Sequence, residues 1–272
     1  MRLRPLLPIP WRCLINLVDD AAKVALVTTV ILFMVTWIWL LIDRRSRAAA
    51  SVRLAWSHHG RRWIPMLVGL MIFGALAEDV TRHEQDESVL KLDHEIWMMA
   101  KGVTPPVRRI AGLIGRLTGE GLAVFVALAA VGFAARGHVY RAGIVLVGTL
   151  GAWALTGILK VAYGIPRPRW NPATVQWGDG FPSGHALVTL VACLLIARAI
   201  GHDRSPRVRV VLWTCAWTIA FLAAGARVVA NAHWTSDVVA GLALGAAWSA
   251  IVTMLADFWE VGGEREETNP SL

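Results

Sequence analysis

The amino-acid sequence predicts an all-α fold, a polytopic transmembrane helix bundle, and three observations support this prediction. Of the 272 residues, 56% are apolar and only 17% are charged, which is not the composition of an ordinary soluble domain. Several apolar stretches approach the length of about 20 residues that a helix needs to cross a bilayer. The clearest of them, residues 24–42, contains no charged side chain.

Seven spans are expected along the chain. The first, 24–42, begins too far from the N-terminus for a signal peptide, and the Asp43-Arg44-Arg45 that follows it is a poor cleavage site, so we expect a retained anchor. The other six are expected at 63–77, about 120–135, 142–162, 186–200, 208–226 and 238–259. These spans divide the chain into an N-terminal segment with a basic loop (1–62), a membrane core (63–259) and an acidic cytoplasmic tail (260–272).

The core contains one long hydrophilic insert, residues 78–118, which is expected outside the cytoplasm. Within it, apolar residues recur at the spacing of one helix face, at Leu92, Ile96, Trp97 and Met99. This pattern predicts a short helix over 92–103 that lies in the membrane interface.

The arginine distribution predicts the orientation of the spans. Loop 43–62 holds six Arg against one Asp, and segment 198–209 holds four Arg against one Asp. Because basic residues favour the cytoplasmic side, these loops and 136–141 are expected inside, whereas loops 78–95, 163–182 and 227–236 face outward. Seven spans then require an external N-terminus, although Arg2, Arg4, Arg12 and Lys23 favour an internal one. Either the first span crosses against its charge, or it does not cross fully.

The formal net charge of +8 does not indicate a nucleic-acid partner, because the basic residues are spread over short loops instead of one amphipathic element. The three cysteines, Cys13, Cys193 and Cys215, have no paired spacing. No disulfide framework and no metal knuckle are therefore expected.

Three polar groups interrupt the apolar pattern, and all of them fall on the expected outer face. In the first, Lys160 ends a helix, and the glycine and prolines of 164–168 turn the chain so that Arg167 returns toward the same place. The other two are Pro182-Ser183-Gly184-His185, directly before a span, and residues 227–237, between the last two spans.

Taken singly, each group has a structural explanation. Basic residues at span ends often extend to the interface, and a lone histidine there is more often structural than catalytic. Ser183 could serve only as a helix N-cap. The tryptophans of these loops fit the aromatic belt of a membrane protein; they are Trp170, Trp177 and Trp234.

Taken together, the three groups predict a site for a phosphoryl group. Lys160, Arg167 and Arg227 are the fixed cations that a phosphate needs, with Arg offering a planar fork and Lys a point charge. The Ser183-Gly184 pair opens a helix and adds backbone N–H donors, which is a common anion cradle.

The histidines supply the chemistry. His233 and Asp237 are four residues apart, so on a helix they share a face. A carboxylate bonded to one ring nitrogen fixes the tautomer and leaves the other nitrogen as a nucleophile. His185 is then left to protonate the leaving oxygen, a task that suits an imidazole.

These residues form three ordered motifs: Lys160 with Arg167-Pro168, Pro182-Ser183-Gly184-His185, and Arg227 with His233 and Asp237. In order and spacing they resemble the type 2 phosphatidic acid phosphatase (PAP2) superfamily, which also includes vanadium haloperoxidases and glucose-6-phosphatase. The resemblance covers about 63–259 and implies a six-helix core, to which the span 24–42 is an N-terminal addition.

The resemblance implies removal of phosphate from a lipid through a phosphohistidine intermediate, without a metal ion or another cofactor. It makes His233 the nucleophile, Asp237 its partner and His185 the general acid. The phosphate-binding groups that it implies are Lys160, Arg167, Ser183, Gly184 and Arg227. In one departure, Ala226 stands where the third motif of the family usually has serine, so one phosphate or backbone contact is missing and a lower phosphate affinity is expected.

The expected function is an integral membrane lipid phosphatase that acts on an isoprenoid or glycerolipid (pyro)phosphate at the outer leaflet of a bacterial cytoplasmic membrane. The candidate substrates are undecaprenyl pyrophosphate, phosphatidylglycerophosphate, phosphatidic acid and lipid A phosphate, and the motifs do not select among their tails. Two alternatives stay open: a phosphotransferase that uses the same site with a lipid acceptor, and a non-catalytic lipid-phosphate transporter. The sequence does not indicate an oligomeric state.

Overall fold

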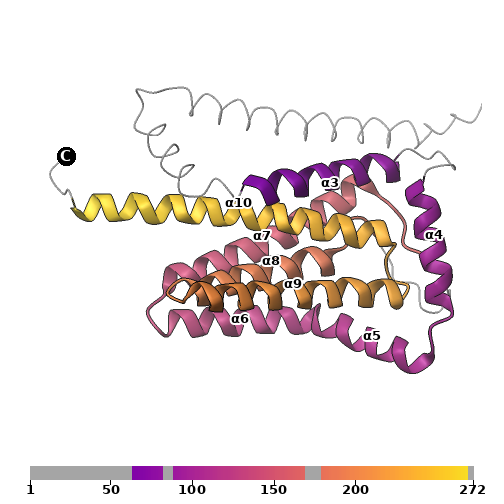
Figure 1. The fold of residues 1–272 in the computed structure, drawn as a ribbon, viewed down its shortest axis with the longest axis horizontal. Coiled ribbons are helices and arrows are strands. Elements are labelled where there is room, and N and C mark those ends of the chain that lie inside the picture. Colours follow the sequence, from indigo (N-terminus) through magenta and orange to yellow (C-terminus); the bar gives the residue numbers. More distant parts are fainter. Residues whose placement is uncertain (1–62, 82–87, 169–178, 269–272) are drawn as a thin grey trace, which may run out of the picture. The chain divides into compact units, whose positions relative to one another are not determined.

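The computed structural model describes residues 63–81, 88–168 and 179–268, which belong to one compact unit of the chain. The expected span 24–42 and the basic loop 43–62 lie outside the described residues. Every regular element described is an α-helix, so the all-α prediction is confirmed for this part of the chain (Figure 1). The elements are α3 (Trp63–Thr81), α4 (Ser88–Lys101), α5 (Pro105–Leu117), α6 (Glu120–Ala134), α7 (Val139–Tyr163), α8 (Gly184–Gly201), α9 (Pro206–Val229) and α10 (Thr235–Thr268).

Six helical stretches in the described part are long and apolar enough to cross a membrane. Large apolar side chains lie on their outer faces; Val161, Met71 and Val147 are 84%, 73% and 72% exposed. Such surfaces are costly in water but suit the hydrocarbon of a bilayer, where a helix satisfies all its own backbone groups. The chain is therefore a multi-pass membrane protein.

The spans expected from the sequence correspond to α3, α7, α8, α9 and α10, with small shifts of their ends, and to the stretch Pro105–Ala134 formed by α5 and α6, which begins well before the expected start at 120. The helix expected over 92–103 corresponds to α4, which begins four residues earlier, at Ser88. The hydrophilic insert contains one further helix, α5, which was not expected. It leads into α6 through a break at Thr118 and Gly119, whose N–H groups donate to the carbonyls of the last turn of α5.

Helix α8 occupies the centre of the bundle, where it packs against α7, α9 and α10. Of its most apolar stretch 67% is buried, against 22% for α9. Its contact with α10 is close because Gly241 faces the first turn of α8: a Cβ at Gly241 would lie only 2.6 Å from the carbonyl oxygen of Ser183. Small residues let two membrane helices approach in this way. The approach brings the N-terminal ends of α8 and α10 together.

The same two helices are also joined at their other ends. Arg198 of α8 and Asp257 of α10 form an ion pair of 2.6 Å, with both side chains 10% exposed. Asp237 and Asp257 are 20 residues apart on α10, which is about 30 Å at 1.5 Å per residue and matches the thickness of the hydrocarbon core. The α8–α10 pair is thus held together near both ends of α8.

Candidate active site

His233 and Asp237 form a buried pair at the start of α10. The turn between α9 and α10 contains Asn231, whose positive φ of 55° lies in the left-handed region that Asn tolerates. Asp237 lies in the first turn of α10, and its Oδ2 atom is 3.0 Å from Nδ1 of His233, with both side chains fully buried. The same Oδ2 atom accepts a hydrogen bond of 3.0 Å from the backbone N–H of Trp234. The carboxylate therefore holds both the imidazole and the turn that carries it.

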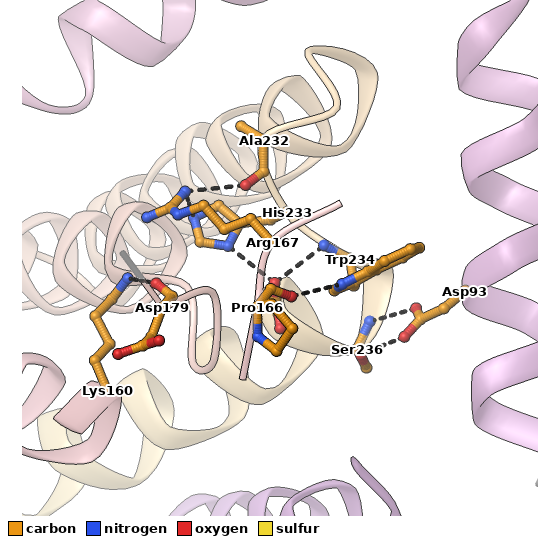
Figure 2. A network of polar contacts seen from close by, with 10 residues as sticks. Asp93, Lys160, Pro166, Arg167, Asp179, Ala232, His233, Trp234 and Ser236 are labelled. Carbon is orange, nitrogen blue, oxygen red and sulfur yellow. Dashed lines mark hydrogen bonds and ion pairs between the residues drawn. The ribbon is translucent and has the colours of Figure 1, made fainter. Parts of the chain in front are cut away.

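Arg167 contacts the other nitrogen of the same ring. Its Nη1 atom lies 3.0 Å from Nε2 of His233 and donates a second bond of 2.9 Å to the carbonyl of Ala232 (Figure 2). A guanidinium can only donate, so Nε2 must be the acceptor and Nδ1 must carry the ring proton. The contacts with Arg167 and Asp237 thus require the same neutral tautomer of His233.

The electrostatic surroundings of His233 also favour the neutral ring. Burial lowers the pKa of His233 well below its ordinary value of 6.5, and the positive charges of Arg167, Arg227 and Lys160 lower it further. Burial also lowers the pKa of Arg167, while the carboxylates of Asp237 and Asp179 oppose that change. Charges in such a site interact more strongly with an anion than they would in water.

The segment between α7 and α8 carries Lys160 and Arg167 to this place. Gly164 ends α7 in the left-handed conformation (φ 59°) and donates to the carbonyl of Lys160. The chain returns where Gly180 donates to the carbonyl of Ile165 over 2.6 Å. Lys160 then donates through Nζ to the carbonyl of Asp179 over 2.7 Å. The two arms of the loop are joined just beside the His233–Asp237 pair.

Gly180 is a second requirement of this arrangement. A Cβ at this position would lie 2.7 Å from Oδ2 of Asp237 and 3.4 Å from Cγ of Arg167. Only glycine leaves room for the side chains of both Asp237 and Arg167 beside this segment. The sequence analysis did not identify this residue, because a close approach between distant segments leaves no local pattern.

The second motif begins α8 at Gly184, with Ser183 as the N-cap residue. Ser183 is fully buried, and its N–H donates to the carbonyl of Asp237 over 2.9 Å, which ties the second motif to the third. Its side chain makes no capping bond, and among the described residues its Oγ atom has no hydrogen-bond partner. The sequence predicted that the backbone N–H of Ser183 would donate to an anion, whereas this N–H is bonded to Asp237 in the structure, and the Oγ atom is the group of Ser183 that lacks a partner.

His185 and Arg227 face the break between α5 and α6. Arg227, in the last turn of α9, is only 6% exposed, and a Cβ at Gly115 would lie 2.7 Å from its Nη1 atom. A Cβ at Gly119 would lie 3.0 Å from Nε2 of His185. Helix α5 and the residues after it thus cover both side chains. The sequence did not predict this role of Gly115 and Gly119, since Gly115 lies within α5 and Gly119 lies in the break after it, and each matters only through a side chain of another helix.

The arrangement can bind an anion and attack it. Lys160, Arg167 and Arg227 supply positive charge around a neutral imidazole whose Nε2 atom carries no proton of its own and accepts a hydrogen bond from Arg167. Among the described residues, no group of three His, Cys, Asp or Glu side chains is placed to hold a metal ion. The structure thus brings all three motifs together at one end of the bundle.

The fold and this site define an α-helical, multi-pass membrane protein with a buried histidine–carboxylate pair among cationic side chains. Residues 141–260 match the family described as the PAP2 superfamily, which confirms the resemblance seen in the sequence motifs for this part of the chain. A solved structure, described as that of the first transmembrane PAP2 type phosphatidylglycerolphosphate phosphatase from Bacillus subtilis, matches with a TM-score of 0.63. The likeness covers 70% of this chain and 95% of that chain at 22% sequence identity, and it concerns the fold. No curated protein matches the chain significantly.

Proposed function

We propose that this protein is a membrane lipid phosphatase that hydrolyses the terminal phosphate of an isoprenoid or glycerolipid (pyro)phosphate through a phosphohistidine intermediate. The observation that carries the proposal is the state of His233. Its Nδ1 proton is directed to Asp237 and its Nε2 atom faces the guanidinium of Arg167. A neutral imidazole oriented in this way is a nucleophile placed beside a phosphate-binding cation.

In the first step, Nε2 of His233 attacks the phosphorus atom and the bond from phosphorus to the lipid oxygen breaks. His185 donates its proton to that departing oxygen, and the Nδ1 proton of His233 stays hydrogen-bonded to Asp237, which stabilises the positive charge on the ring. Lys160, Arg167 and Arg227 neutralise the charge that develops on the phosphoryl oxygens.

In the second step, water attacks the phosphohistidine. His185, now neutral, accepts a proton from that water, the N–P bond breaks, and its electron pair returns to Nε2. Inorganic phosphate leaves, and both histidines have regained their starting protonation states. The cationic side chains act in both steps, because the same oxygens carry the charge each time.

The proposed site faces the exterior or periplasm, in the outer half of a bacterial cytoplasmic membrane. The basic segment 198–209, which is expected inside, joins the C-terminal end of α8 to the start of α9. The site lies at the opposite ends of these two helices, at His185 and Arg227. Because the similar solved structure is that of a phosphatidylglycerolphosphate phosphatase, it favours phosphatidylglycerophosphate among the candidate substrates, although its likeness to this chain is one of fold.

The test is phosphate release from a panel of the four candidate lipid phosphates in detergent, with wild type and His233→Ala compared. The matched control is His202→Ala, which makes the same change at an exposed position at the far end of α8. We expect wild type and the control to release phosphate and His233→Ala to lose about 10³-fold or more in kcat, as when a nucleophile is removed.

Other outcomes would select another function. If label from a lipid pyrophosphate appeared on an added lipid acceptor instead of as free phosphate, the protein would be a phosphotransferase. If wild type released no phosphate from any lipid and His233→Ala still moved lipid phosphate across vesicles, the transporter alternative would replace the phosphatase.

A further inference from the structure

Asp93 of α4 binds the start of α10 from outside the three motifs. It is 5% exposed, and its two carboxylate oxygens divide between two donors of Ser236: Oδ1 accepts from the backbone N–H over 2.8 Å and Oδ2 from Oγ over 2.5 Å (Figure 2). Burial raises the pKa of this carboxyl, and the hydrogen bonds from Ser236 and Thr235 oppose that rise. Ser236 directly precedes Asp237.

This contact caps the helix that carries Asp237. The first N–H groups of a helix have no intrahelical partner, and a side chain at the N-cap usually satisfies one of them. The residue before α10 is Trp234, whose side chain has no acceptor. Asp237 accepts the N–H of Trp234, and Asp93 accepts the N–H of Ser236. Two carboxylates thus share the cap, and one of them comes from a different helix.

Trp97 gives α4 a second contact with the same turn. It follows Asp93 by four residues, so both lie on one face of α4, and its ring centroid is 6.0 Å from that of Trp234. Trp234 in turn donates through Nε1 to the carbonyl of Pro166 over 3.0 Å, directly before Arg167. Through Trp234, helix α4 therefore supports both the turn that carries His233 and the segment that carries Arg167.

The opposite face of α4 is not needed for this contact. Leu92, Met98 and Met99 on α4 are 52%, 51% and 70% exposed, whereas Asp93 is turned toward the bundle. In Figure 1, α4 crosses the end of the bundle beside the start of α10, and it contacts α3, α9 and α10. A helix that lies across the end of the bundle is thus bonded to the turn that carries the proposed nucleophile.

We propose that Asp93 is a positioning residue for the reaction: by capping α10 through Ser236, it sets the rotation of Asp237 and so the alignment of His233 with the phosphorus atom. The proposal rests on the proposed function. Asp93 touches neither ring nor substrate, so its loss should lower kcat and leave KM nearly unchanged. A misplacement of the reacting group by about 1 Å costs up to about 100-fold.

The experiment uses Asp93→Asn, which keeps the shape but replaces one acceptor oxygen by a donor NH₂, and Ser236→Ala, which removes only the hydroxyl. The control is Glu95→Gln, the matched change at an exposed carboxylate on the same helix. We expect Asp93→Asn to lower kcat about 10- to 100-fold and Ser236→Ala about 3- to 10-fold, with KM within about twofold and Glu95→Gln equal to wild type.

A double mutant separates positioning from general damage. If Asp93 acts through Asp237, then Asp93→Asn should cost less than about twofold further in an Asp237→Asn background. If its effect repeats in full there, the proposal is overturned. It is also overturned if Asp93→Asn stays within about twofold of wild type, or if both Asp93→Asn and Ser236→Ala are unfolded at the assay temperature, since the contact would then be structural.

A second readout does not depend on turnover. In ¹⁵N-histidine-labelled protein, the Nδ1–H proton of His233 should give a downfield NMR signal in wild type and Glu95→Gln, and Asp93→Asn should broaden or shift it. If wild type hydrolyses none of the lipids but the signal responds as expected, the proposed function fails while the positioning role stands. An unchanged signal in Asp93→Asn overturns the positioning role.

Discussion

Nη1 of Arg167 lies 3.0 Å from Nε2 of His233. In the proposed reaction, Nε2 is the atom of the imidazole that attacks phosphorus. The same Nη1 atom is bonded to the carbonyl of Ala232. In the proposed reaction the guanidinium therefore lies where it can bind a phosphoryl oxygen next to His233. When a substrate binds, Arg167 can exchange its bond to the ring for bonds to that oxygen while the bond to Ala232 keeps it in position.

The first prediction concerns Arg167→Lys. An ammonium is a single point and cannot present the fixed fork that holds the Ala232 carbonyl and a phosphate together. We expect kcat/KM to fall about 100-fold although the positive charge is kept. Steady-state phosphate release measures this, with Arg204→Lys, at an exposed position in the loop after α8, as the control. A loss below about threefold would show that only the charge of Arg167 matters.

The second prediction concerns pH. Because burial and then the charges of Arg167 and Arg227 hold the pKa of His233 well below 6.5, its nucleophilic form persists in mild acid. We expect no loss of kcat/KM from protonation of His233 between about pH 7.5 and 6. Removing a neighbouring cation raises the pKa of a histidine, so Arg167→Ala should move the acid limb to higher pH.

The measurement is the pH profile of kcat/KM for both proteins, each normalised to its own maximum. Two results together would contradict this reasoning. They are an acid limb of wild type near pH 6.5, the ordinary pKa of a histidine, and an Arg167→Ala profile with its acid limb at the same pH.

The third prediction compares two glycines of α5. A methyl group at Gly115 would lie 2.7 Å from Nη1 of Arg227, whereas one at Gly112 would have no other group within 4 Å. The guanidinium is the flexible end of its side chain, so Gly115→Ala should leave the protein folded but displace Arg227. We expect KM to rise about tenfold from the loss of one phosphate contact, as for a charge-assisted hydrogen bond.

Gly112→Ala is the matched control for this change. It should keep wild-type kinetics and stabilise the helix by up to about 1 kcal/mol, visible as a higher Tm in detergent. Equal KM values for the two variants would mean that Arg227 does not bind the phosphate.

The fourth prediction concerns metal ions. The cations of the proposed site are Lys160, Arg167 and Arg227, which supply the charge that a metal ion supplies in other phosphatases. We expect hydrolysis to persist in excess EDTA, measured as phosphate release before and after dialysis. Complete loss of activity that Mg²⁺ restores would contradict the role given to the three side chains.

Most of the features that the sequence did not predict depend on contacts between segments far apart in the chain. Helix α5 was assigned to a hydrophilic insert because Arg108, Arg109 and Arg116 interrupt its apolar residues. Gly115 and Gly180 matter only because side chains of other segments pass beside them. Asp93 lies in the helix expected over 92–103 without belonging to any motif, yet it bonds to Ser236, 143 residues further along the chain. No local pattern reveals such contacts.

By itself, the sequence determined that the chain crosses a membrane several times, where the spans of the described part lie, and which residue types its three polar motifs offer. These properties follow from local rules, since apolar length and helical hydrogen bonding decide what can cross a bilayer. Only the tertiary structure decided that Arg167 meets Nε2 of His233, that Ser183 is tied to Asp237, and that α4 caps α10. Those relationships depend on how closely α8 and α10 pack and where the loop from Gly164 returns, which is settled by contacts between segments far apart in the sequence.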